Sequence, residues 1–245
     1  MLLSLLLQFA YAAEDEAVGF SLMDIWNHSG WLARSVIVCL ILMLVVSIIV
    51  GVERLIAFNR ARSQSMRLAG AIVGPLRNQD IAGALKVAND EAYKSAYLGA
   101  LLRAGLGEMN LRVDKFGVHN AERAIHKAMA EELSKLKRGF AILATTGSTA
   151  PFVGLFGTTF GVVNAFQGMA TEGSGLAAIS AGISEALITT GVGIFVAVIG
   201  VWAFNYFNGR LEKVADELNS SEADFLDWAE KLVQGQSDNQ AQAGK

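Results

Sequence analysis

A single carboxylate, Glu185, stands inside a long apolar stretch and is the residue best placed for chemistry. Residues 176–208 contain no other charged side chain. An acid in low-dielectric surroundings, with no basic residue of a membrane segment at its depth, favours its protonated form and exchanges protons near physiological pH. We therefore expect Glu185 to relay protons at the centre of a membrane helix. The structural alternative is a neutral carboxyl that only bonds neighbouring helices.

Hydroxyl and small side chains accompany this carboxylate in two neighbouring apolar runs, residues 139–170 and 176–208. A short Gly-containing link, 171–175, predicts an antiparallel helical hairpin. If the tip of this hairpin lies between residues 171 and 172, Thr158 is expected at the same depth as Glu185. Hydroxyl groups beside a carboxyl can hold water and pass protons. Further polar or small positions that support such a path are Thr189, Thr190, Ser184, Thr149, Gly154 and Gly161. Close helix packing is the alternative role for the glycines.

The composition predicts an all-α membrane protein. Apolar residues make up 53% and charged residues 18% of the chain, with 25 Gly and only 2 Pro. A third apolar run, residues 32–53, is long enough at about 20 residues to cross the hydrocarbon layer. Trp26 and Trp31 precede it, as is typical of a membrane interface. We expect three transmembrane helices, at 32–53, 139–170 and 176–208.

Lysine and arginine predict the orientation. Fifteen of the 20 lie in residues 53–139, whereas residues 1–30 and the link contain none. Basic residues favour the cytoplasmic side, so the N-terminus is expected outside and the C-terminus inside. Residues 14–31 read as an amphipathic segment on the periplasmic surface. Residues 1–13 resemble a signal peptide, and their removal or retention stays open.

The remaining segments read as cytoplasmic helices. Residues 54–138 predict a helical domain with breaks near Gly74-Pro75 and Asn89-Asp90. From Asn120 the apolar period continues into the second span, which predicts one helix of about 75 Å. Residues 209–233 predict a further helix, and residues 234–245 a disordered polar tail.

Several classes of function find no support in the residues. The one cysteine, Cys39, excludes an internal disulfide, and the three histidines have no companions at metal-ligand spacing. No nucleophile–base set or nucleotide-binding loop is present. We expect neither an enzyme nor a cofactor, metal or nucleic-acid protein.

Two motifs resemble the ExbB/TolQ/MotA proton-channel family, most closely its ExbB/TolQ branch. They are ATTGSTAPFVGLFGTTFGVVNAF at residues 144–166 and GISEALITTGVGIFVAV at residues 182–198. The resemblance implies that the family's membrane glutamate is Glu185 and that its pore threonines are Thr158 and Thr190. A flagellar stator is disfavoured, because that branch has four spans.

The resemblance also implies partners. It predicts a homopentamer around the single-span helices of an ExbD/TolR-like dimer, in a bacterial inner membrane. Protons would then drive an envelope machine, such as one with a TonB/TolA-like or motility component. The alternative is a structural scaffold that binds a partner helix without conducting protons.

Overall fold

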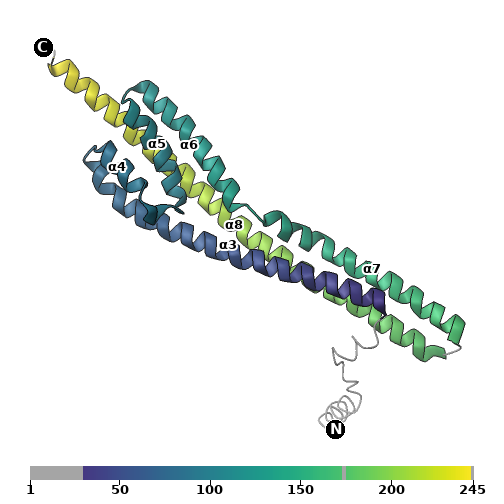
Figure 1. Cartoon of the computed structure of the whole chain (residues 1–245). Coiled ribbons are helices and arrows are strands. Elements are labelled where there is room, and N and C mark those ends of the chain that lie inside the picture. The colour runs from purple at the N-terminus through teal and green to yellow at the C-terminus, as the bar shows by residue number, and fades with distance from the viewer. Residues whose placement is uncertain (1–29, 173–174, 244–245) are drawn as a thin grey trace, which may run out of the picture. The chain divides into compact units, whose positions relative to one another are not determined.

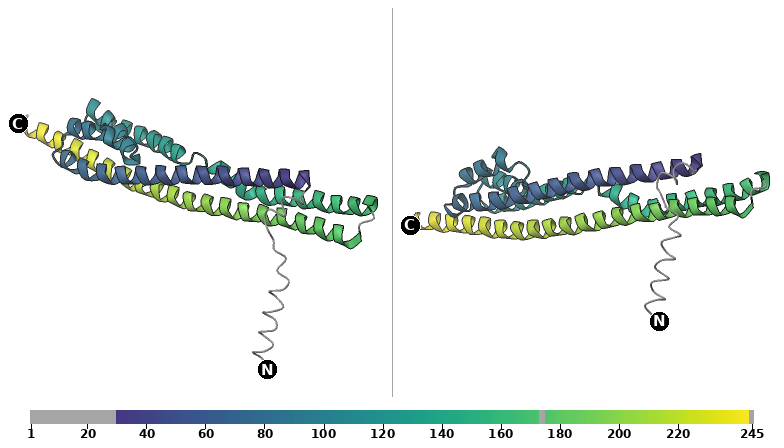
Figure 2. Two further views of the ribbon diagram at one scale, coloured as in Figure 1. Left: turned by 60° about the horizontal axis from the view of Figure 1, so that its bottom comes forward. Right: turned by 90° about the horizontal axis from the view of Figure 1, so that it is seen from below.

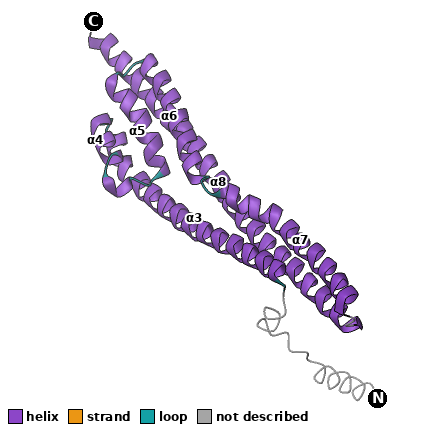
Figure 3. Ribbon diagram, turned by 45° about the vertical axis from the view of Figure 1, so that its right-hand side comes forward, coloured by secondary structure: helices purple, strands orange, loops and turns teal. Residues whose placement is uncertain are grey.

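The computed structural model describes residues 30–172 and 175–243, and its described part consists of helices joined by short turns (Figures 1 and 3). The predictions for residues 1–13 and for most of 14–31 lie outside this part. Three helices are long: α3 (Trp31–Arg77), α7 (Phe140–Glu172) and α8 (Gly175–Ala243). The shorter elements are α4 (Ile81–Ala88), a 3₁₀ turn (Glu91–Tyr93), α5 (Tyr97–Leu111) and α6 (Lys115–Leu136).

Three of these helices are long and apolar enough to cross a membrane. They are α3, α7 and the part of α8 that follows Gly182. Most residues of each apolar window are not buried within the chain, as expected for surfaces that face lipid or other helices. The prediction of an all-helical protein with three candidate spans is confirmed.

The chain divides into two compact units. The hairpin unit contains α7 and α8 up to residue 199 with the start of α3, in its described residues 30–45, 146–172 and 175–199. The core unit contains residues 46–145 and 200–243. Within the hairpin unit, α7 and α8 lie side by side in each view (Figure 2).

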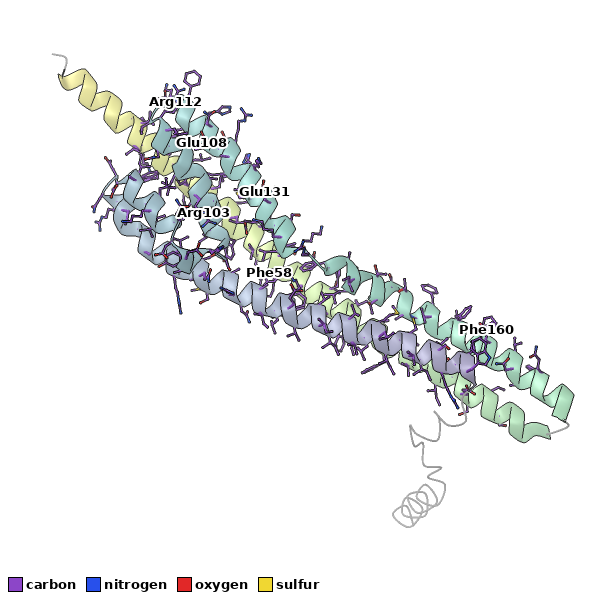
Figure 4. All side chains as sticks on the ribbon, in the orientation of Figure 1. Phe58, Arg103, Glu108, Arg112, Glu131 and Phe160 are labelled. Carbon is purple, nitrogen blue, oxygen red and sulfur yellow. The ribbon has the colours of Figure 1, made fainter. Side chains whose placement is uncertain are left out.

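Aromatic and aliphatic side chains fill the core unit. Phe58 stacks on Phe140 and Phe207, with ring centroids 6.4 and 6.1 Å apart (Figure 4). Further along, α5 and α8 pack through Leu106 and Phe225, which are both buried. The burial of these apolar side chains gives the core unit its own hydrophobic core.

Aspartates begin three of the short elements of this unit. The carboxylates of Asp80, Asp90 and Asp114 accept hydrogen bonds from backbone amides two or three residues ahead, at 2.8–2.9 Å. This is the usual role of Asp at a helix N-terminus. Arg103 donates to the carbonyl of Ala88 at 2.9 Å and so ties α5 to the end of α4 (Figure 4).

The predicted single helix from Asn120 through the second span is wrong. α6 ends at Leu136, α7 begins at Phe140, and Gly139 between them has a φ of +84°. This left-handed conformation suits glycine and ends an α-helix. The side chain of Arg54 stabilises the break, because its Nη1 donates to the carbonyls of Lys135 and Leu136 at 3.1 and 3.5 Å.

Two other helices run further than the sequence indicates. α3 continues without a break from the first span to Arg77, so that Pro75 lies in its last turn. α8 continues to Ala243, beyond the predicted end at residue 233. Its last residues include Ala and Gln, which propagate a helix at low cost once it has formed. The break near Asn89-Asp90 is confirmed between α4 and the 3₁₀ turn.

Candidate functional site

Small residues bring α7 and α8 close together in the hairpin unit. A Cβ added to Gly154 would lie 2.7 Å from the carbonyl oxygen of Thr189 and 3.2 Å from the Cα of Gly193. One on Gly182 would lie 2.5 Å from the Cβ of Ala165. Such close backbone contact is how helices associate where lipid supplies no hydrophobic drive. Gly154 therefore serves the packing of the hairpin, the alternative that the sequence left open.

These contacts also fix the register of the hairpin. Gly161 lies against Ala186, and Gly157 lies against Thr189. Thr158 is therefore level with Thr189, and Glu185 lies about one turn nearer the tip. The expectation that Thr158 and Glu185 share one depth is wrong by that turn. The error comes from the position assumed for the tip of the hairpin. Because α7 runs to Glu172 and α8 begins at Gly175, the tip lies two residues further along the chain than assumed.

Glu185 is half-buried and has a backbone partner. Its Oε1 accepts a hydrogen bond from the amide of Gly30 at 2.8 Å. Gly30 comes two residues before the apolar run that starts at Leu32, a distance of about 3 Å along a helix axis. Glu185 therefore lies beside the N-terminal end of the first span, whereas the sequence predicts the centre of a membrane helix.

A basic residue lies close to this level. Arg34 follows Gly30 by one turn of α3, about 6 Å along the axis, and its side chain is half-buried. Among the described residues of the hairpin unit, the one basic residue is therefore about one turn of α3 from the level of Glu185. The sequence does not predict the relative depth of Arg34 and Glu185, because this depth depends on how α3 packs against α8.

The threonine hydroxyls differ in their hydrogen-bond partners. Thr158 Oγ1 donates to the carbonyl of Leu155 at 2.7 Å. Thr189 is fully buried, and its Oγ1 lies 2.7 Å from the carbonyl of Ala186 and 3.3 Å from that of Gly154. The Oγ1 of Thr190 is buried without a hydrogen-bond partner among the described residues. Thr190 is therefore the hydroxyl with capacity to bind a water or a group from another chain.

The other predicted site residues lie along the same hairpin but not in one cluster. Ser184 is exposed, Thr149 is half-buried two turns of α7 before Gly157, and Gly161 packs on Ala186. The structure brings together Gly154, Thr189 and Thr190, and separately Glu185 and Gly30. The amide of Gly30 carries no signal in the sequence, because a main-chain donor is common to almost every residue.

The exposed side of α7 carries polar side chains among large apolar ones. Ser148, Thr159, Asn164 and Gln167 are exposed although the helix is apolar enough to span a membrane. The exposed apolar side chains of the same helix are Phe152, Leu155, Phe156, Phe160 (Figure 4), Val163 and Phe166. Polar groups on a membrane helix are costly in lipid and face a protein partner or water. This face is therefore suited to contact with other helices.

Comparisons with known proteins agree with the motifs of the hairpin. A model of the MotA/TolQ/ExbB proton channel family matches residues 94–220. The chain is 41% identical over 119 residues to the Tol-Pal system protein TolQ of Pseudomonas aeruginosa, a match that covers 46% of this chain and 52% of that protein. It is 39% identical over 108 residues to the biopolymer transport protein ExbB of Xanthomonas campestris, covering 44% and 43%.

A third relative matches more of this chain. The biopolymer transport protein ExbB of Pseudomonas putida is 32% identical over 165 residues, which cover 65% of this chain and 49% of that protein. The chain thus spans about half the length of the curated relatives it matches.

Proposed function

This chain belongs to the MotA/TolQ/ExbB proton channel family, and we propose that it is a proton-conducting, stator-type subunit of an inner-membrane motor. The observation that carries the proposal is the half-buried Glu185, which accepts a backbone hydrogen bond from Gly30 and lies about one turn of α8 from the hydroxyls of Thr189 and Thr190. A protonatable group held there, next to polar positions that admit water, is what a proton path requires.

The proposed path has two parts. Glu185 lies at the N-terminal end of the first span and takes up protons arriving from that side. Thr189 and Thr190 follow about one turn further along α8, where the Oγ1 of Thr190 has no hydrogen-bond partner among the described residues and is available to water or a partner group. Thr158 is level with Thr189, so these hydroxyls continue the path toward the other side of the membrane.

A second polypeptide completes the path in this proposal. The exposed side of α7, which carries polar as well as apolar side chains, suits a partner helix, and we assign it to an ExbD/TolR-like single-span dimer inside a homopentamer of this chain. The Lys and Arg distribution supports a periplasmic N-terminus and a cytoplasmic C-terminus. A potential of 100 mV supplies about 2.3 kcal/mol per proton, enough to bias a conformational step more than tenfold.

Proton flux in vesicles tests the proposal. The chain is copurified with its single-span partner, reconstituted, and assayed with a pH-sensitive dye under an imposed potential. Glu185→Gln should lower the flux by about 100-fold or more, since the proton-transfer group is lost, and Glu185→Asp should retain part of it. Glu172→Gln, which removes the other carboxylate of the hairpin, is the matched control and should conduct normally. An assembled Glu185→Gln complex with full flux would contradict the proposal.

The alternative is a scaffold without conduction. The hydrogen bond from Gly30 to Glu185 favours it, because a carboxylate that only fastens α3 to α8 would make the same contact. In a scaffold, Glu185→Gln keeps an acceptor oxygen and all function, and the machine works without a proton gradient. The same flux assay separates the two candidates.

A further inference from the structure

Gly30 occupies the N-cap position of α3. Its carbonyl accepts the first intrahelical bond, from the amide of Arg34 at 3.1 Å, while its own amide has no partner within the helix. That amide donates to Oε1 of Glu185 at 2.8 Å, across 155 positions of sequence. One atom of the candidate proton path is therefore bonded to the main chain of the first span.

The charges of the hairpin unit leave α3 as the element that attracts Glu185. Among the described residues of this unit, the charged ones are Arg34, Glu172 and Glu185. In this unit α7 has no charged side chain before Glu172, and α8 has none besides Glu185. The start of α3 carries the positive end of a helix dipole as well as Arg34. Among the described residues of this unit, the positive charge and the amide donor nearest in level to Glu185 therefore both come from the start of α3.

We propose that the Gly30 amide is a positioning group for Glu185 and couples the start of the first span to the protonation of the path. The ionised carboxylate is held by the amide and by the positive helix end. Protonation removes the charge, which weakens both attractions and frees the first turn of α3. The inference rests on the proposed role of Glu185 in proton transfer, and it adds that the first turn of α3 moves when Glu185 is protonated.

Two substitutions at one position isolate the amide. Gly30→Pro removes the N–H, which no helical bond uses, so the helix itself loses nothing. Gly30→Ala keeps the N–H, and a Cβ at this position meets no atom of the described residues within 4 Å. The two variants therefore differ in whether residue 30 can donate a hydrogen bond to Glu185. Both are assayed in vesicles that contain the complex copurified with the single-span partner.

The first readout is the dependence of proton flux on the pH of the side that faces Gly30. Gly30→Ala should reproduce the wild-type profile. Gly30→Pro should shift it, because the carboxylate loses the donor that positions it. An unshifted Gly30→Pro profile would overturn the inference, and so would an equal loss of flux in both variants.

The second readout does not depend on conduction. Hydrogen exchange at the Gly30 amide, corrected for its intrinsic pH dependence, should be about tenfold faster in Glu185→Ala than in the wild type. In the wild type it should also accelerate on acidification, and in Glu185→Ala it should not. If Glu185→Gln conducts fully, the proposed function fails whatever the exchange shows. If conduction needs Glu185 but exchange is insensitive to pH, only the coupling to α3 fails.

Discussion

At the scale of single residues, two glycines that face each other, Gly154 and Gly193, set the distance between α7 and α8. A Cβ on Gly193 would lie 2.7 Å from the carbonyl oxygen of Ala150 and 3.0 Å from the Cα of Gly154. Both neighbours are main-chain atoms, which cannot turn away as a flexible side chain does. The hairpin therefore has no space for even a methyl group at this point.

Gly193→Ala should accordingly destabilise the hairpin by about 1–3 kcal/mol, the usual cost of overpacking. Gly191→Ala is the matched control, because a Cβ there meets no atom within 4 Å in the part of the chain that the structure describes. It should be neutral, or stabilising by up to about 1 kcal/mol through helix propensity. Thermal unfolding of both variants in one mild detergent makes the comparison. Equal stability of the two would show that α7 and α8 are not in backbone contact.

A second residue of interest is Glu222 in the core unit. It is buried, and its Oε1 lies 2.8 Å from Nε2 of His126. Burial raises the pKa of Glu222, the charge of His126 opposes this rise, and nearby Glu122 adds to it. A carboxyl whose pKa is raised on folding contributes stability below its unfolded value, and this contribution is lost as the pH rises through its folded value.

Glu222→Gln removes this titration. As the pH rises from 4.5 toward neutrality, the melting temperature of the wild type should therefore fall relative to that of the variant. Glu230→Gln, an exposed carboxylate on the same helix, is the control and should follow the wild type. A constant difference between wild type and Glu222→Gln over this range would count against a buried, titrating Glu222.

At the scale of the elements, the junction between α6 and α7 depends on a buried cation. Arg54 is 7% exposed and donates to two carbonyls in the last turn of α6. The carbonyl of Lys135 also accepts from the amide of Arg138 at 3.3 Å. The last carbonyls of a helix lack amide donors from a following turn, and a cation at this end also balances the helix dipole. Gly139 completes the junction, with Val50 of α3 beside it.

Arg54→Gln should weaken the end of α6 by about 1–3 kcal/mol, the worth of hydrogen bonds to a charged group. The exposed Lys137 and Arg138 at the junction are trypsin sites, so faster cleavage there reports the loss. Arg60→Gln removes an exposed arginine of the same helix and should cleave like the wild type. Unchanged cleavage in Arg54→Gln would indicate that the junction does not need this cap.

The elements also show what the sequence could predict. Apolar length alone was sufficient for three spans, and Gly182-Ile183-Ser184-Glu185 with its partner motif was sufficient for the family. The break at Gly139 was missed, because the apolar period passes through it and one glycine does not distinguish a turn from a tolerated helical residue. The predicted register of α7 against α8 differs from the observed one by about one turn. A shift of two residues in the position of the tip changes the partner of every residue across the hairpin by four positions.

Contacts between distant segments were beyond prediction for a different reason. The bonds from Gly30 to Glu185 and from Arg54 to Lys135 join residues 155 and 81 positions apart. Both use main-chain groups, which no residue type marks. Only the packing of α3 on its neighbours determines which amide or carbonyl lies within reach.

At the scale of the whole molecule, the distribution of basic residues predicts how the chain is inserted. In a Cys39→Ser background, Asn219→Cys places a thiol on the exposed surface of α8, and Ser174→Cys places one in the link between the spans. A membrane-impermeant maleimide should label the link in intact cells and Asn219→Cys only after permeabilisation. The reverse pattern would contradict the orientation inferred from the lysines and arginines.

The exposed Cys39 has a consequence for spectroscopy. It follows Gly30 by nine residues of α3, about 14 Å along the axis, and it is the only cysteine of the chain. A nitroxide attached to this thiol should relax faster with dissolved oxygen than with a water-soluble nickel chelate, as expected for a probe surrounded by acyl chains. The ratio of the two relaxation rates gives the immersion depth of Cys39, and the helical rise converts it into that of Glu185.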